Sequence, residues 1–165
     1  MRWTALNIKV HPDGTGTPKK GDQSIGKSRC GRTTKIHAIV AEVNLPIVRR
    51  LSPGSAADDT EGRQLMAEVP TEMGRNKPLL MDKAYEGDGC RAKAKRCGMC
   101  PVVPSKSNRK VSWKYDKELY KKRNTVERHF RNIKQFRRVF TRYDKLDETY
   151  NTFIAIANIN LMLRN

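Results

Sequence analysis

The order of the apolar segments limits the folds open to this chain of 165 residues more than any other property of its sequence. Apolar and polar residues alternate over residues 4–10, and two further apolar runs follow at 34–43 and 45–51, separated only by Asn44. Alternation of this kind is typical of β-strands, and the short connection at Asn44 predicts a hairpin. We therefore expect the chain to begin with three strands, the last two of them antiparallel.

The rest of the chain alternates between helical and strand-like patterns. A helix capped by Asp58 or Asp59 is predicted to run to about Val69, and later helices over 88–97, 116–140 and 146–163, the last with Asp147 as its N-cap. Short apolar runs at 78–82 and 101–104 predict strands. The resulting order, β-β-β-α-β-α-β-α-α, is that of an RNase H-like α/β fold with a mixed sheet and flanking helices.

Two predicted helices carry an apolar stripe, and two basic segments carry none. The stripe over 116–140 consists of Leu119, Val126, Phe130, Ile133 and Phe140, and that over 146–163 of Tyr150, Phe153, Ile154, Ala157 and Leu161. Apolar residues at this spacing are expected to face a core. Residues 11–32, which open with the turn sequence at 11–16, and residues 105–114 have no such periodicity and are predicted to be loops.

The charge of the chain indicates the kind of partner that it binds. There are 34 Lys and Arg against 17 Asp and Glu, so the formal net charge is +17. Residues 91–142 hold 18 basic residues and three acids, which are Asp116, Glu118 and Glu127. An excess of this size is typical of proteins that bind a polyanion, most often DNA or RNA. At this point a ribosomal-type basic protein, or charge that serves only solubility, stays open as an alternative.

The cysteines do not form a recognisable zinc site. Cys97 and Cys100 have the Cys-x-x-Cys spacing, but a structural site needs a second pair of ligands. The remaining candidates are not spaced as a pair: they are Cys30, Cys90, His11, His37 and His129. The first residues form no apolar signal segment, and no apolar run approaches the roughly 20 residues of a membrane span. We expect a cytoplasmic protein with reduced cysteines and no membrane contact.

Four polar residues of the helix predicted over 116–140 share one face. At about 100° per residue they lie within an arc of roughly 60°, beside the apolar stripe; they are Tyr120, Arg123, Glu127 and Lys134. A carboxylate flanked by cations at the edge of a buried stripe suits a metal ligand with phosphate-binding neighbours. The alternative is an ordinary amphipathic helix in which Arg123 and Glu127 form an i, i+4 ion pair.

A second acid, Asp82, directly follows the apolar run that ends at Met81. Sheets of α/β proteins bind their ligands beyond the carboxyl ends of the strands, which is where Asp82 is expected to lie. The alternative is that Asp82 caps a turn or helix beginning at Lys83.

The spacing Tyr-x2-Arg-x3-Glu-x6-Lys resembles the YREK signature of bacterial insertion-sequence DDE transposases. Further segments resemble the same family and occur in the same order: residues 26–31 (GKSRCG) with 34–37 (TKIH), 51–54 (LSPG), 80–85 (LMDKAY), 102–104 (VVP), and 136–138 (FRR) with 141–143 (TRY). The resemblance covers nearly the whole chain, which is identified on this ground as a member of the family.

The resemblance implies a catalytic site and its partners. Asp82 and Glu127 would be the second and third acids of the DDE triad and ligands of Mg²⁺ or Mn²⁺ in a two-metal phosphoryl transfer on DNA. Tyr120 would stack on a base or pack against its helix. The basic residues implied to bind DNA phosphates are Arg123, Lys134, Arg137 and Arg138. Expected partners are the DNA of the element ends and target, and further copies of the chain in the active complex.

The first acid of the triad is expected to be missing. The family places it on the first strand, before the segment that resembles residues 9–12. Counting back from Lys9 puts its position near Thr4 in this chain. Asp13, in Asp13-Gly14-Thr15, resembles the motif that usually carries this acid. It lies beyond the strand in a turn sequence, however, so it is the weaker candidate for a third acid.

We expect the chain to form one domain with little strand-transfer activity. Residues 1–165 are predicted to be the catalytic domain without the family's N-terminal DNA-binding region, as a truncated or decayed copy or as the downstream product of a frameshift. We expect little or no strand-transfer activity from the chain alone. Two other functions stay open: a non-catalytic basic DNA-binding fragment, and a different RNase H-like nuclease that would act on RNA–DNA hybrids.

Overall fold

The structure is a computed structural model of the chain and describes residues 1–15, 20–109 and 111–164. Both predicted loops are therefore described only in part, because residues 16–19 and Lys110 lie outside the described residues.

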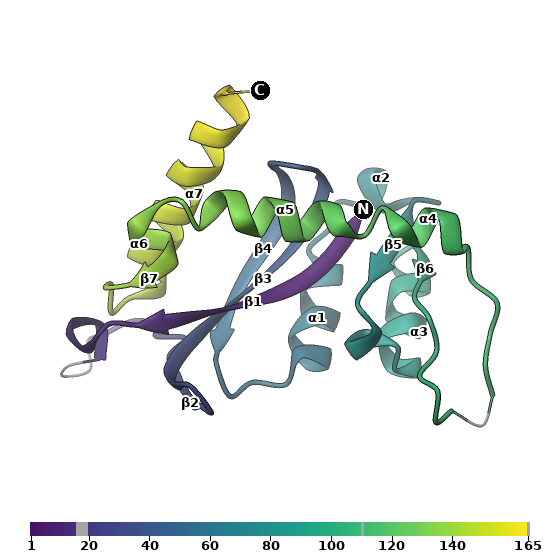
Figure 1. Cartoon of the computed structure of the whole chain (residues 1–165), viewed down its shortest axis with the longest axis horizontal. Helices are drawn as coiled ribbons and strands as arrows, with labels where there is room; N and C mark the ends of the chain where they lie inside the picture. The colour runs from purple at the N-terminus through teal and green to yellow at the C-terminus, as the bar shows by residue number, and fades with distance from the viewer. Residues whose placement is uncertain (16–19, 110, 165) are drawn as a thin grey trace.

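A seven-stranded mixed sheet forms the centre of the described chain (Figure 1). Its strands are β1 (Arg2–Val10), β2 (Gly26–Ser28), β3 (Gly31–Glu42), β4 (Leu45–Pro53), β5 (Pro78–Met81), β6 (Cys100–Val102) and β7 (Thr141–Arg142). The path β2-β3-β1-β5-β6 is hydrogen-bonded in that order, while β4 pairs with β3 and β7 with β1. β3 and β4 form the predicted antiparallel hairpin, β1 is antiparallel to β3, and β5 and β6 are parallel to their neighbours. The RNase H-like fold class is thereby confirmed.

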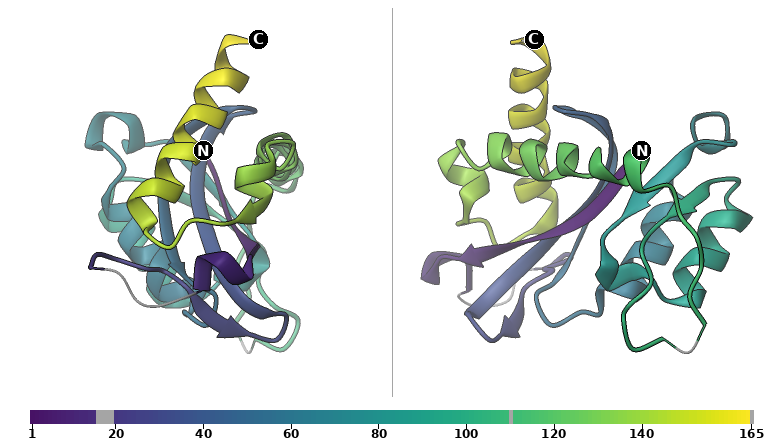
Figure 2. Two further views of the ribbon diagram at one scale, coloured as in Figure 1. Left: turned by 90° about the vertical axis from the view of Figure 1, so that its left-hand side faces the viewer. Right: turned by 45° about the vertical axis from the view of Figure 1, so that its right-hand side comes forward.

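Helices cover both faces of the sheet (Figure 2). They are α1 (Asp58–Ala67), α2 (Thr71–Gly74), α3 (Asp88–Arg96), α4 (Lys117–Lys121), α5 (Asn124–Ile133), α6 (Arg137–Phe140) and α7 (Asp147–Leu163), with 3-10 helices at Pro12–Thr15 and Lys83–Tyr85. Two apolar cores result. One packs α5, α6 and α7 against β1, β3 and β4, and the other packs α1 and α3 against the opposite face.

The prediction of a single helix over 116–140 is wrong, because this segment forms three helices, α4, α5 and α6. Lys122, Arg123 and Lys134 keep right-handed helical dihedral angles, so α4 and α5 follow one another closely, but the hydrogen-bond ladder is interrupted. The chain then turns at Phe136, which is extended. In consequence Phe140 leaves the predicted stripe and is 56% exposed, and Val139 is buried in its place.

Several predicted termini are also corrected. Ala57 occupies the N-cap of α1 and Leu146 that of α7, so neither Asp58, Asp59 nor Asp147 caps a helix. Their carboxylates have longer-range partners: Asp58 binds Lys35, and Asp147 accepts hydrogen bonds from Ser24 and from the fully buried Arg142. Because such partners come from distant segments, the local pattern could not show them. Strands β2 and β7 lie in segments where we predicted a loop and no strand.

Helix α1 approaches β1 most closely at Gly62. Trp3 is fully buried on β1, and a Cβ atom at position 62 would overlap the carbons of its ring. The Trp3 ring also packs against the ring of Tyr85, with ring centroids 3.7 Å apart, so a Cβ atom at position 62 would require this packed pair to move. The absence of a side chain at Gly62 therefore fixes how α1 packs on the sheet.

We expect Gly62→Ala to lower the free energy of unfolding by about 1–3 kcal/mol, because overpacking of a rigid core outweighs the better helix propensity of alanine. Gly89→Ala in α3 is the matched control, since its Cβ would lie 3.4 Å from the flexible end of Arg63. Urea denaturation should show the control unchanged or stabilised by up to about 1 kcal/mol. Equal effects of the two substitutions would contradict this packing.

Candidate active site

The parallel pairing of β1 with β5 brings two predicted positions together. Arg2 pairs with Leu80 and Trp3 with Met81, so Thr4 on β1 and Asp82 after β5 are the next residues along the two neighbouring strands. Trp3 and Met81 belong to the core on the α1 and α3 side. Because successive side chains of a strand point to opposite faces, Thr4 is directed to the α5 side of the sheet. This side is where Glu127 lies.

Helix α5 places Glu127 at the margin of the core. Val126, Phe130 and Ile133 are at most 5% exposed and hold the helix on the sheet. Glu127, adjacent to Val126 in sequence, is 49% exposed and is directed away from this buried face. The preceding turn, α4, is capped by Asp116, whose Oδ1 accepts a hydrogen bond from the Leu119 amide at 2.8 Å. The packed face and this cap together fix the segment that carries the signature residues.

Arg123 joins the two predicted metal ligands. Its Nη1 lies 3.2 Å from Asp82 Oδ2, and its Nη2 lies 2.7 Å from Glu127 Oε1. The Arg123 side chain is 22% exposed, and those of Asp82 and Glu127 are 39% and 49% exposed. Two carboxylates from distant parts of the chain thus converge on one cation. The i, i+4 pair considered from sequence is present, and it extends to Asp82.

Arg2 holds the junction between α4 and α5 against the sheet. Its Nε donates a hydrogen bond of 3.2 Å to the Lys122 carbonyl, and its Nη1 donates to the Ala41 carbonyl at the end of β3. One guanidinium therefore ties β1 and β3 to the residue that precedes Arg123. Sequence analysis missed this role, because an arginine in a partly buried strand carries no local signal of its partners.

A hollow of about 390 Å³ opens between β1 and α5 beside Glu127. Its apolar wall combines strand and helix residues, and its two cations lie in α5 and at the C-cap of α5. The lining consists of Thr4, Ala5, Leu6, Glu127, Phe130, Arg131 and Lys134. Lys134 thus shares this hollow with Glu127 and with Thr4. Arg131 was not singled out from sequence, although its spacing of four residues after Glu127 and three before Lys134 places it on their side of the helix.

Tyr120 packs within the chain beside the two acids. Its ring makes an edge-on contact with Tyr115, with centroids 5.6 Å apart, and the Arg123 guanidinium carbon lies 5.9 Å from its centroid. Burial is the main cause that raises the pKa of Tyr120, and the nearby Asp82 adds to the shift. The pKa of Tyr85, three residues after Asp82, is raised chiefly by burial. Both hydroxyls are neutral at physiological pH.

Three other predicted residues lie away from these acids. Asp13 is exposed beyond the far end of β1 and pairs with His11; at about 3.3 Å per residue, the strand from Thr4 to Val10 spans roughly 20 Å. Arg137 is exposed on α6. Arg138 is bound by Asp144 at 2.8 Å and lies over the ring of Phe153.

The basic segment after β6 is anchored next to the strand end that carries Asp82. Arg109 binds the buried Glu86 at 2.6 Å, and Trp113 donates a hydrogen bond from Nε1 to the Val103 carbonyl. The Arg91 guanidinium stacks on Trp113, 3.6 Å from the ring centroid. In its described part, this segment therefore has a defined course along α3 and presents basic residues such as Lys106 and Lys114 to solvent.

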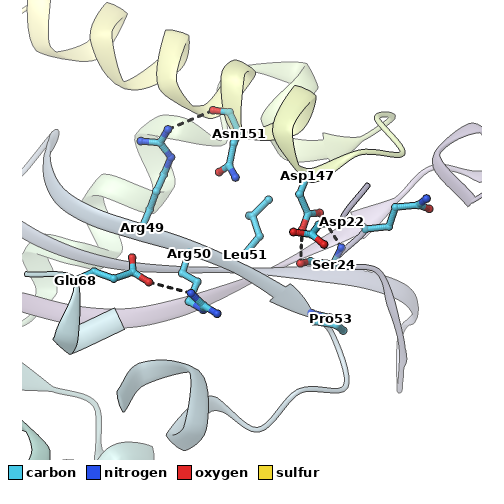
Figure 3. A pocket seen from close by; sticks show the side chains of 10 residues that line it. Asp22, Ser24, Arg49, Arg50, Leu51, Pro53, Glu68, Asp147 and Asn151 are labelled. Atoms are coloured by element: carbon cyan, nitrogen blue, oxygen red, sulfur yellow. Dashed lines mark hydrogen bonds and ion pairs between the residues drawn. The ribbon is translucent and has the colours of Figure 1, made fainter. Parts of the chain in front are cut away.

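A second hollow, of about 480 Å³, lies between β4 and the start of α7 (Figure 3). Its charged side chains largely bind one another and the backbone: Arg50 pairs with Glu68, and Arg49 donates to the Asn151 carbonyl. In the sheet, β3 and β1 separate β4 from β5 and Asp82. We interpret this hollow as part of the packing interface between α7 and the edge of the sheet rather than as part of the site around Asp82 and Glu127.

The two acids fit a divalent cation in part. Both are carboxylates, the oxygen ligands that Mg²⁺ and Mn²⁺ prefer, and the guanidinium between them shows that both reach a single positive charge. Among the described residues, however, no group of three or more His, Cys, Asp or Glu is placed to hold a metal ion. Thr4, near which the first acid is expected, has a hydroxyl and no carboxylate.

No described helix is long and apolar enough to cross a membrane.

We expect Arg2→Ala to loosen the α4–α5 junction. Hydrogen bonds from a charged donor contribute about 1.5–3 kcal/mol, so amide hydrogen exchange near residues 121–126 should accelerate by about tenfold or more. Asn7→Ala, at an exposed position of the same strand, is the control and should leave this exchange unchanged. Acceleration spread equally over α7 would indicate global destabilisation and contradict a local clamp.

Comparison with known proteins gives the family. Residues 7–163 match the sequence profile of the family described as Transposase DDE domain. A protein of Brucella ovis, named as a candidate transposase for insertion sequence element IS6501, is 28% identical over 137 residues, which cover 80% of this chain and 99% of the relative. The range that the profile matches spans β5 and α5 and therefore contains Asp82 and Glu127. The chain belongs to the DDE transposase family.

Proposed function

We propose that this chain carries the site for metal-dependent cleavage and transfer of DNA strands in insertion-sequence transposition, with Asp82 and Glu127 as metal ligands. The observation that carries the proposal is the convergence of these two acids, from β5 and α5, on the single guanidinium of Arg123. Membership of the transposase family supports the reaction class, and the charge of +17 supports DNA as substrate.

The side chains around the acids have complementary tasks. Asp82 and Glu127 would hold Mg²⁺ or Mn²⁺, which when bound polarises a phosphodiester and activates the attacking hydroxyl. Lys134 and Arg131, which line the hollow with Glu127, would neutralise DNA phosphates close to the reacting bond. Arg137, Lys106 and Lys114 are exposed and would extend this contact along the DNA. The engagement of Arg138 with Asp144 favours a structural role for that residue.

Thr4 explains why we expect weak activity. Thr4 comes directly after the pairing of Trp3 with Met81, next to Asp82, and it lines the hollow that also contains Glu127. In this position a third carboxylate would complete the ligand set. A threonine hydroxyl is a neutral and weaker ligand for a hard divalent cation. We propose that residues 1–165 form one catalytic domain whose metal centre lacks this acid.

We predict that Thr4→Asp increases Mn²⁺-dependent nicking of supercoiled plasmid DNA by at least about tenfold over the unsubstituted chain, because a third carboxylate strengthens metal binding and charge stabilisation. Gel assays of purified protein at equal concentration measure the effect. The gain should disappear in the double variants Thr4→Asp/Glu127→Gln and Thr4→Asp/Asp82→Asn.

A matched control is Asn7→Asp, which adds the same charge to an exposed position of β1. It should leave nicking unchanged. Efficient cleavage by the unsubstituted chain that is lost on Glu127→Ala would contradict an incomplete centre, and so would a gain in Asn7→Asp equal to that in Thr4→Asp.

A second function, non-catalytic DNA binding, is favoured by Thr4 and by the pairing of both acids with Arg123. A fragment of this kind would bind DNA through phosphate contacts alone. Its DNA affinity would not depend on Asp82→Asn, or would increase, because a negative charge is removed. It would gain no cleavage from Thr4→Asp, which separates it from the proposed transposase.

Under either function, we predict that DNA affinity falls by about tenfold or more between 50 and 200 mM salt, because phosphate contacts release bound counterions. Fluorescence anisotropy with a labelled duplex measures this slope. Replacing Lys134 and Arg137 together by glutamine should reduce the slope. An affinity that does not depend on salt would contradict phosphate-dominated binding.

We also propose that the protein acts in the cytoplasm, where it would meet the element DNA and further copies of itself.

A further inference from the structure

The position of the Arg123 guanidinium has a consequence for metal binding. Its two terminal nitrogens bind different carboxylates, Glu127 one helical turn away and Asp82 at the end of β5. If Asp82 and Glu127 are metal ligands, as proposed above, this guanidinium lies among the oxygens that a divalent ion would bind. A divalent ion at these carboxylates would be repelled by the guanidinium at close range, and the repulsion is stronger in a partly buried site than in bulk water.

We propose that Arg123 is a latch: a resident cation that occupies the two carboxylates until a DNA phosphate draws it away and leaves them to the divalent ion. This inference rests on the proposed function of Asp82 and Glu127. It adds a competition between Arg123 and metal, and a coupling between metal and DNA.

The Arg123 guanidinium has an aromatic neighbour in addition to the two carboxylates. The Tyr120 ring centroid lies 5.9 Å from the guanidinium carbon, a distance at which the face of a tyrosine attracts a cation. The side chain is 22% exposed, so it can reach a ligand in solvent. A guanidinium also binds phosphate in a bidentate manner, which gives it a partner of the same geometry as the carboxylates that it leaves.

The junction that carries Arg123 is itself held in place. Arg2 binds the Lys122 carbonyl, and the buried face of α5 fixes Glu127. Exchange of partners therefore requires only rotation of the Arg123 side chain. Because binding free energies are reciprocal, a phosphate that removes Arg123 from the carboxylates strengthens metal binding, and metal strengthens phosphate binding by the same factor. The chain would thus hold its metal ion firmly only on DNA.

Binding of Mn²⁺, followed by electron paramagnetic resonance of the free ion, tests the latch without any need for cleavage. Arg123→Gln removes the resident cation and should bind Mn²⁺ about threefold to tenfold more tightly than the unsubstituted chain, a range set by the modest strength of partly exposed ion pairs. Arg123→Lys keeps a charge that cannot bridge two carboxylates, and should give an intermediate affinity. Glu127→Gln and Asp82→Asn define the binding that does not involve the site.

The matched control is Arg128→Gln, which removes the same charge from an exposed position of α5. It should change Mn²⁺ affinity by much less than Arg123→Gln. The titration is then repeated with a short duplex, after subtraction of the Mn²⁺ that the duplex binds alone. The duplex should raise the affinity of the unsubstituted chain and leave that of Arg123→Gln nearly unchanged.

The outcomes separate the latch from the proposed function. Mn²⁺ binding that depends on Glu127 but is equal or weaker in Arg123→Gln would overturn the latch and leave the metal site intact. An equal gain from DNA in both proteins would overturn the coupling. If no variant binds Mn²⁺ in a manner that depends on Glu127 and Asp82, both the latch and the proposed metal site are wrong. Melting temperatures of Arg123→Gln and Arg128→Gln show that both variants remain folded.

Discussion

The candidate site depends on the parallel pairing of β1 with β5. This pairing joins a strand from the start of the chain to one some 75 residues later, and its register sets Thr4 beside Asp82. On one face of the sheet, Trp3 of β1 packs against α1 and Tyr85. On the other face, β1 is covered by α5. A shift by one residue would turn Thr4 to the opposite face and separate it from Glu127.

The charges of the site follow from this arrangement. Asp82 follows β5 and Glu127 lies in the first turn of α5, and the apolar residues of both elements are buried, so the packing of the core fixes the backbone positions of the two acids. Arg123 lies between the two acids, and its positive charge offsets the repulsion between them. An acid at position 4 would increase the negative charge and with it the demand for a divalent ion.

Much of the fold, and part of the site, could be predicted from sequence because both depend on local periodicity. The strand at β5, the acid at its end and the i, i+4 relation of Arg123 to Glu127 all follow from spacing along the chain. The breaks near Lys122 and Lys134 have no glycine or proline to mark them, and the roles of Arg2 and Arg142 depend on partners more than a hundred residues away. A buried arginine such as Arg142 has the same sequence signal as a DNA-binding one, so only tertiary structure separates them.

Anomalous diffraction from crystals of Thr4→Asp soaked in Mn²⁺ would test whether Asp82 and Glu127 hold a divalent ion beside position 4. We expect an anomalous peak at about 2.0–2.6 Å from carboxylate oxygens of Asp82, Glu127 and the new acid, with Arg123 displaced from both native acids. A peak bound elsewhere, or Arg123 still bridging Asp82 and Glu127 in crystals saturated with Mn²⁺, would contradict this expectation.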